Sequence, residues 1–328
     1  MHGWIILDKP LGLGSTQGVA AVKRALRDGG YAKAKVGHGG TLDPLATGVL
    51  PVAVGEATKL AGRMLDSDKI YDFTIAFGAQ TDTLDLEGTV IAESDVRPTL
   101  AQVEAVLPRF TGPIEQVPPA YSALKVDGER AYDLARAGAD VVLEKRAVTV
   151  HLLIKKEEDP HPTLSHEDGR GLSPAPSPAL AGEGRDEGLL PSITLTAHVS
   201  KGTYIRSLAR DIALALGTVG HVTMLRRTKA GPFDLSHAIS LDKLTEFGKA
   251  RALHEILLPL RAGLDDIPAL ALTPEQAGAL RQGRVVTGIA ADASVIEGGP
   301  HFAVLDDVPV ALVDIQNREV RVVRGFNL

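Results

Sequence analysis

Residues 36–60 read VGHGGTLDPLATGVLPVAVGEATKL, in which a glycine-rich loop runs into a continuous apolar stretch. Asp43 stands directly before Pro44, and a residue before proline is biased towards an extended backbone. Residues 49–54 predict a buried strand. An Asp-Pro pair alone is most often an ordinary turn. The whole stretch predicts a stiff loop that presents one carboxylate before a buried strand, with glycines that permit left-handed turns and close backbone approach at positions 37, 39, 40 and 48.

Strands and helices are mixed on both sides of this loop. Short strands are predicted at residues 4–7 and 71–77, where apolar residues run together or alternate. Ser15 or Thr16 is expected to cap a helix that follows the first strand. The mixture indicates an α+β protein, with further helices predicted at residues 56–65, 99–107, 129–137 and 203–216.

Residues 157–191 form a segment of different character, with six prolines, five glycines and no isoleucine, valine or aromatic residue. Such a segment buries too little apolar area to offset its ordering entropy, so we expect it to be disordered. Its flanks alternate with period 2 and predict two neighbouring strands joined by this long loop. The residues expected to share one face of each strand are Val148, Val150, Leu152 and Ile154, and then Ile193, Leu195, Ala197 and Val199.

The chain changes again at about Pro268. A helix at residues 274–282 is followed by short strands at 302–305, 310–315 and 320–323. Because 328 residues are more than a single core usually holds, we expect two domains, the first over 1–262 and a small β-rich one over 268–328.

The composition and the missing motifs argue against disulfide-bonded, membrane-spanning and cofactor-binding proteins. There is no cysteine, no apolar run of about 18 residues, and no basic leader in the first ten residues. The sequence also lacks a phosphate-binding loop, a dinucleotide fingerprint, a G-x-S-x-G elbow and metal-binding histidine spacing. We therefore expect a cytoplasmic protein that works without a metal or a cofactor.

Charge is distributed unevenly along the chain. The net charge is −6, and residues 157–191 alone hold two basic against eight acidic residues. Residues 1–65 and 192–262 are basic, with eight against four and ten against five. These two blocks could form a basic groove for nucleic acid if they meet in space. On charge alone, two solvated faces are an equally good interpretation.

Six motifs, in order, resemble those of the bacterial tRNA pseudouridine-55 synthases, the TruB family. The central one is GHGGTLDPLATGVLPVAVGEATKL, which resembles the catalytic motif of that family. Residues 268–328 are similar to its small PUA-like domain. The other motifs are LDKPLGLGST, DSDKIYDFTIAFGAQTDTLDLEG, PPAYSALKVDGERAYDLAR, SKGTYIRSLARDI and HVTMLRRTKAGPF.

The resemblance implies the pseudouridine synthase fold, with a central mixed, largely antiparallel sheet flanked by helices and a PUA-like RNA-binding domain. It implies an isomerase that flips uridine 55 out of the T-loop of tRNA, cleaves its glycosidic bond and rejoins the base through C5. The expected partner is the T-arm of tRNA, with no membrane, metal or cofactor. We expect a monomer that requires no protein partner.

The resemblance also assigns residues. Asp43 aligns with the catalytic aspartate, whose role as nucleophile or as proton acceptor both require an ionised carboxylate beside the ribose. Tyr71 aligns with the tyrosine that stacks on the base and assists C5 deprotonation, and Arg206 with the arginine that pairs with the aspartate. From pattern alone, Tyr71 would be a core residue and Arg206 a surface charge.

The resemblance also implies a second group of residues, which contact the substrate. His38 aligns with the histidine that fills the gap left by the flipped nucleotide, and Tyr204 with a second tyrosine of the active site. Without the resemblance, His38 would be an ordinary loop histidine. The remaining expected substrate contacts are Lys9, Leu225, Arg226 and Lys201, and Arg227 and Lys229 are further candidates for phosphate contacts.

Two other functions stay open. A tRNA-binding or tRNA-folding protein could keep this scaffold without catalysis, but it would have no need of Asp43, Tyr71 and Arg206 together. A related synthase could act on a different RNA. The sequence departs from the family pattern in the acidic segment 157–191 and at Gly14, where the family often has serine.

Overall fold

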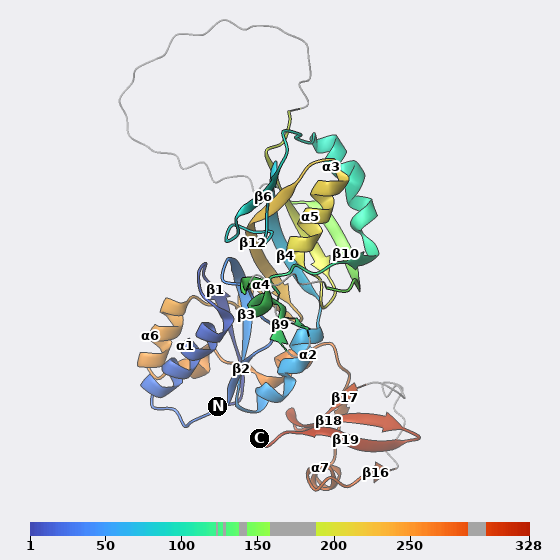
Figure 1. The fold of residues 1–328 in the computed structure, drawn as a ribbon. Helices are drawn as coiled ribbons and strands as arrows, with labels where there is room; N and C mark the ends of the chain where they lie inside the picture. The colour runs from blue at the N-terminus through green and yellow to red at the C-terminus, as the bar shows by residue number, and fades with distance from the viewer. Residues whose placement is uncertain (123, 127–128, 138–142, 158–187, 288–299) are drawn as a thin grey trace, which may run out of the picture.

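The computed structural model describes residues 1–122, 124–126, 129–137, 143–157, 188–287 and 300–328 (Figure 1). Most of the segment predicted to be disordered, residues 158–187, lies outside the described residues. Across the described part of the chain, no helix is long and apolar enough to cross a membrane.

A ten-stranded sheet forms the frame of the larger part of the protein. All of its strand pairs are antiparallel except β3 with β12, which are parallel. This confirms the expected mixed, largely antiparallel sheet. The main path runs through β14 (Leu258–Pro259), β1 (Gly3–Lys9), β3 (Ala46–Val54), β12 (Gly220–Ala230), β4 (Lys69–Phe77), β11 (Ser192–Val199), β10 (Arg146–Lys155) and β7 (Gly112–Gln116), while β2 (Val36–His38) pairs with β3 and β13 (Phe233–Asp234) with β12.

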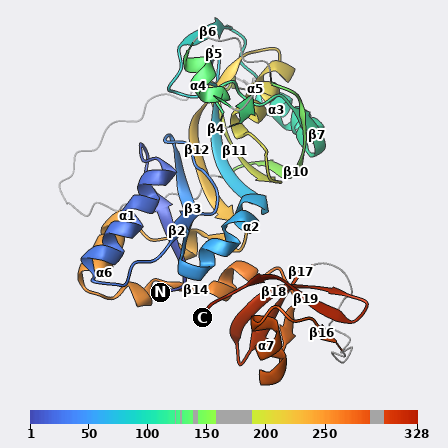
Figure 2. The same ribbon diagram turned by 60° about the horizontal axis from the view of Figure 1, so that its bottom comes forward.

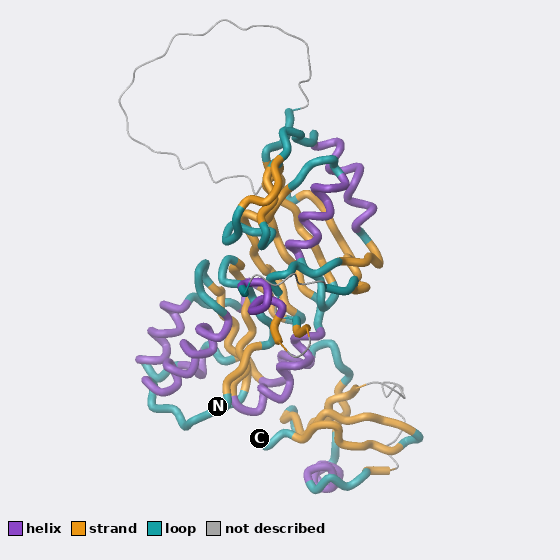
Figure 3. Tube along the Cα trace, in the orientation of Figure 1, coloured by secondary structure: helices purple, strands orange, loops and turns teal. Residues whose placement is uncertain are grey.

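One pair of helices covers each half of this sheet. The strands continue from one half of the sheet to the other (Figures 2 and 3). In one half, α1 (Ser15–Asp28) and α6 (Leu241–Lys249) enclose a core that includes Leu7, Val22 and Leu50. In the other half, α3 (Leu100–Val106) and α5 (Ile205–Ala215) pack on β4 and β11 around Phe73 and Leu208. The parallel seam between β3 and β12 joins the two halves.

Several expected helices are present with different bounds. The helix expected at 56–65 is a 3-10 helix, η1 (Gly55–Leu60), followed by α2 (Ala61–Asp66). The helix expected at 129–137 is shorter, because Glu129–Arg130 pairs as β9 with β8 (Lys125–Val126) and leaves only α4 (Ala131–Arg136). After α3 the chain continues as a 3-10 helix, η2 (Leu107–Phe110), which contains Pro108. Other short elements are β5 (Ala79–Thr81), β6 (Val90–Glu93), η3 (Leu235–His237), η4 (Leu253–Glu255) and η5 (Leu260–Leu264).

The strands β10 and β11 are neighbours, as expected, and Ile193, Leu195, Ala197 and Val199 all lie buried on one face of β11. For β10 the expected alternation is wrong beyond Val150. A β-bulge between Val150 and Leu152 shifts the register, so Leu153 is buried while Leu152 and Ile154 are 44% and 46% exposed. The extra residue in the bulge reverses which residues of the strand face the core.

The segment expected to be disordered, residues 157–191, was predicted to extend too far towards the C-terminus. The N–H of Leu190 donates to the Pro98 carbonyl at 2.8 Å, and the Pro191 carbonyl accepts from Phe77 N at 2.9 Å. Leu190 also packs against the core beneath α3 and α5. The composition of the preceding polar stretch led to the prediction of disorder, but Leu190 lies just before β11 and its side chain contributes to the core.

Replacing residues 159–187 with a short glycine-containing turn is expected to leave the melting temperature unchanged or higher. Lys156 N donates to Thr194 O at 3.0 Å, so the two ends of the connection already lie side by side. Going from about 35 to about 11 connecting residues saves roughly 1 kcal/mol of closure entropy. Thermal unfolding of the two chains measures this, and a fall of several degrees would contradict it.

The C-terminal part forms a separate five-stranded sheet with its own core, around Leu280, Val313 and Val320. It contacts the larger part through Leu312 and Phe326, which join the cluster of Trp4 and Leu264. The expected small β-rich unit is therefore present. Its elements are β15 (Ala269–Ala271), α7 (Pro274–Arg281), β16 (Val286–Thr287), β17 (Pro300–Leu305), β18 (Val308–Gln316) and β19 (Glu319–Gly325).

Candidate active site

The loop that carries Asp43 connects β2 to β3 and lies beside the parallel seam of the sheet. Asp43 O accepts a hydrogen bond from Ala46 N at 3.0 Å, which closes a turn just before β3. Gly48 has a φ of +98°, and a Cβ there would lie 2.2 Å from the Arg227 carbonyl oxygen. Glycine is required at this position because β12 lies so close to β3.

Two buried cations hold the loop from behind. The Lys9 ammonium donates to Leu13 O at 2.6 Å and to Pro44 O at 3.2 Å. The Arg227 guanidinium donates to the carbonyl oxygens of Val49, Thr41 and Gly40, at 2.8, 3.3 and 3.2 Å. Both side chains are almost completely buried. Burial lowers the pKa of Lys9 to about 8, and the nearby Asp43 carboxylate partly opposes that shift.

This geometry changes the interpretation of both residues. Lys9 and Arg227 donate to main-chain carbonyls behind the Asp43 loop instead of presenting their charges at the surface. Arg227 lines the Asp43 cavity while its guanidinium donates to main-chain carbonyls, so the phosphate contact expected for it stays a prediction. Lys9 donates to the Pro44 carbonyl, next to Asp43 in the chain, and lies close enough to feel the charge of the Asp43 carboxylate. Both cations position the loop.

Arg206, near the start of α5, joins two carboxylates. Its Nη2 lies 2.9 Å from Asp43 Oδ2, and its Nη1 lies 3.0 Å from Asp85 Oδ2. The guanidinium also donates to Thr83 O at 2.9 Å and to Tyr121 O at 3.0 Å. The Arg206 side chain is 9% exposed, whereas that of Asp43 is 46% exposed. Arg206 is thus held in one orientation, and the expected contact with Asp43 is present.

Asp85 is a partner of Arg206 that the sequence analysis did not single out. Its side chain is 11% exposed and accepts hydrogen bonds from Thr83 Oγ1 and from Glu87 N. In the sequence, Asp85 is an acidic residue between Leu84 and Leu86, and this local pattern does not indicate whether its side chain is buried. Its partner Arg206 lies in a distant part of the chain.

Asp43 lines a cavity of about 300 Å³. This volume is at the lower end of the usual range for ligand pockets, about 300–1,000 Å³. Tyr71 from β4, Tyr204 before α5 and Leu225 from β12 line it together with Arg206. Burial raises the pKa of Tyr204, so its phenol stays protonated near neutral pH. Five of the residues expected in the site therefore meet around one cavity.

Three other expected residues lie outside this lining. Arg226 neighbours Arg227 in β12 and forms a two-point ion pair with Asp8, at 3.0 and 2.8 Å. Lys201 is well exposed and pairs with Asp66 at 3.0 Å, next to the lining residue Gly202. His38 lies on β2, where burial and the charge of Arg227 lower its pKa and favour the neutral ring.

The arrangement supports one kind of chemistry in particular. The ion pair with Arg206 orients the Asp43 carboxylate, and its partial exposure leaves the carboxylate accessible from the cavity. Beside it lie an aromatic ring that a flat ligand could stack on and a protonated phenol. Such a carboxylate can attack a carbon centre or take a proton from it.

Solved structures share this fold. The described chain superposes with a TM-score of 0.67 on a Cbf5-Nop10-Gar1 complex, at 26% identity over 99% of this chain and 84% of that one. The same score is found for an H/ACA RNP bound to a substrate RNA containing 2′-deoxyuridine, at 23% identity over 99% and 85%. The fold is therefore that of the Cbf5 class of pseudouridine synthases.

Sequence comparison identifies the family within this class. Residues 28–166 match the TruB family pseudouridylate synthase N-terminal domain, and residues 206–265 match the tRNA pseudouridylate synthase B C-terminal domain. The tRNA pseudouridine synthase B of Novosphingobium aromaticivorans is 62% identical, over 100% of this chain and 98% of that protein. That of Zymomonas mobilis is 54% identical, over 100% and 96%. The chain belongs to the TruB family and is a pseudouridine synthase.

Proposed function

We propose that this enzyme converts uridine 55 in the T-loop of tRNA into pseudouridine, with Asp43 as the catalytic residue. Relatives of 62% and 54% identity, named as tRNA pseudouridine synthases, support tRNA as the substrate. The observation that carries the assignment of Asp43 is its ion pair with the buried Arg206 at the wall of the cavity.

In this proposal the target uridine leaves the base stack and enters the cavity. The Asp43 carboxylate acts on the ribose, either by attacking it or by taking a proton from it. The bond between N1 and C1′ breaks, the uracil rotates, and a bond forms between C5 and C1′. C5 then loses its proton and N1 gains one. Atoms and oxidation state are conserved, so the reaction requires no redox cofactor.

The neighbouring residues are assigned from their positions. Tyr71 stacks on the uracil and assists removal of the C5 proton, while Tyr204 and Leu225 bound the same cavity. Arg206 holds the Asp43 carboxylate in one orientation towards the cavity. His38, whose neutral ring lies on the adjacent strand β2, fills the gap left by the flipped nucleotide.

Phosphate binding is assigned to Lys201 and Arg226. In the structure each is paired with a carboxylate, Asp66 and Asp8 respectively. Because these side chains are at least one-quarter exposed, a phosphate can replace either carboxylate at small cost. We assign catalysis to residues 1–262 and further RNA contact to a PUA-like domain over 268–328. A single chain is sufficient for the activity.

The test uses the purified full-length protein and a tRNA transcript labelled with tritium at C5 of uridine. Isomerisation releases the C5 proton, so tritium release should reach one equivalent per tRNA without any added protein or cofactor. A matched transcript with cytidine at position 55 should release none. No release from the first transcript would contradict the proposed activity. Equal release from both would contradict the position.

Replacing Tyr71 with phenylalanine is expected to lower single-turnover product formation by about 10²-fold, the lower end of the usual contribution of a positioned acid or base. Stacking on the base survives the change, so tRNA affinity should stay within about threefold of the wild type. Tyr31→Phe removes a hydroxyl that bonds Leu253 N at 3.1 Å, well away from the cavity, and serves as the control. An unchanged rate in Tyr71→Phe would leave Tyr71 as a packing residue.

A further inference from the structure

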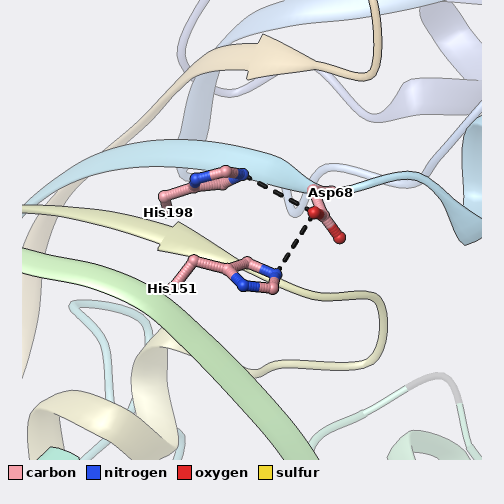
Figure 4. Close-up of side chains that lie close together, drawn as sticks. All are labelled: Asp68, His151 and His198. Carbon is pink, nitrogen blue, oxygen red and sulfur yellow. Dashed lines mark ion pairs between the residues drawn. The ribbon is translucent and has the colours of Figure 1, made fainter. Parts of the chain in front are cut away.

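A cluster of metal-ligating side chains lies outside the Asp43 cavity, on the half of the sheet formed by β4, β11 and β10. Asp68 directly precedes β4, His198 belongs to β11 and His151 to β10. Figure 4 shows both imidazoles directed towards the Asp68 carboxylate. None of the three lines the cavity that holds Asp43 and Arg206.

The β-bulge in β10 creates this cluster. Val150 pairs with Val199 and Leu152 with His198, so His151 is the extra residue between two paired positions. Val150 and Val199 are buried on the face covered by α3 and α5. The side chains of His151 and His198 point to the opposite, partly exposed face, where the two rings lie 4.8 Å apart between centroids.

The separations suit a shared metal ion. His151 Nε2 lies 3.2 Å and His198 Nε2 lies 3.7 Å from the same oxygen, Asp68 Oδ2. The three potential ligand atoms all lie within 4.8 Å of one another. Ligands about 2.0–2.1 Å from a tetrahedral ion are separated by about 3.3 Å. Small rotations of side chains that are 37–48% exposed close the difference.

We propose that Asp68, His151 and His198 form a binding site for one divalent transition-metal ion of the Zn²⁺ class. Two imidazole nitrogens and one carboxylate are a common ligand set for such ions and leave open positions for water. A single exposed carboxylate with two imidazoles discriminates against Mg²⁺ and Ca²⁺, which prefer several oxygen ligands.

The charges around the cluster are compatible with this ion. The rings of His151 and His198 lie beside each other and would bind the ion as neutral imidazoles. Lys229 also faces His198 and opposes a cation there. The Asp68 carboxylate, 3.7 Å from His198 Nε2, contributes the compensating negative charge. The bound ion would link three adjacent strands at the end of the sheet where β4 begins.

The experiment titrates the full chain, prepared without a polyhistidine tag, with Zn²⁺ by calorimetry and with Co²⁺ by visible absorption. We expect one ion per chain, with at least tenfold weaker binding in His151→Gln, His198→Gln and Asp68→Asn. Saturating Zn²⁺ should raise the melting temperature of the wild type and not that of these variants.

The matched control is His237→Gln. His237 pairs with Asp234 at 3.1 Å elsewhere on the surface, but that pair lacks a second histidine. This variant should keep wild-type stoichiometry and affinity. Circular dichroism of each variant confirms that a loss of binding is not a loss of folding. Absence of saturable binding at micromolar Zn²⁺, or equal affinity in the wild type and in the folded variants of the cluster, would overturn the proposal.

Discussion

Replacing Asp43 with asparagine is expected to lower pseudouridine formation by about 10³-fold or more, while tRNA still binds. The amide has nearly the same size and can still meet Arg206, but it can neither attack the ribose nor accept its proton. Contacts with phosphates and with the shape of the T-arm do not involve this carboxylate, so affinity should change by less than about threefold.

Single-turnover rates with excess enzyme separate this chemical effect from binding. The control is Asp28→Asn, which removes a carboxylate of similar exposure at the end of α1, far from the cavity. That variant should retain the wild-type rate. Turnover of Asp43→Asn within tenfold of the wild type would disprove the catalytic role of Asp43.

Replacing Arg206 with lysine is expected to reduce both activity and stability, although the positive charge is kept. The guanidinium bonds Asp43 and Asp85 through different nitrogens, and an ammonium group cannot reproduce this fork. One of the two carboxylates is then left without its partner. For the buried Asp85 this costs up to about 3–5 kcal/mol, the range found when a buried ion pair is broken.

The activity effect should appear as a fall in kcat of about 10²-fold, with a smaller change in KM, because the proposed role of Arg206 is to orient Asp43 and not to bind tRNA. Chemical denaturation gives the loss of stability. Arg210→Lys is a matched control one turn further along α5, where the arginine pairs with the adjacent Asp211 at 2.8 Å. If Arg206→Lys retained both its rate and its stability, the fork between the two carboxylates would be unimportant.

Parts of the fold and of the site were predictable because they depend on local patterns. The alternation of apolar residues at 71–77 and 193–199 predicted two strands that the sheet contains. The loop before Pro44 was placed correctly in front of β3. The pairing of Arg206 with Asp43 was expected only from the resemblance, since no local pattern joins residues so far apart in the sequence.

Other features were not predictable for definite physical reasons. A period-2 pattern assumes an unbroken strand, so it assigned the wrong face to Leu152, which follows the bulge. Lys9 and Arg227 look like surface cations by composition. They are buried because the carbonyls of the Asp43 loop accept their hydrogen bonds, and those carbonyls come into position only when β1, β3 and β12 assemble.

The sequence by itself determined several of the strands, the position of the carboxylate loop before one of them and which family the motifs resemble, because each of these is encoded in neighbouring residues. Only the tertiary structure decided that Asp85 completes the site and that Asp68, His151 and His198 meet. The contact of Asp85 with Arg206 depends on the loop after β5 meeting α5, and the Asp68, His151 and His198 cluster depends on strand order and on the bulge in β10. Such long-range geometry arises from packing of the whole sheet and leaves no local pattern in the chain.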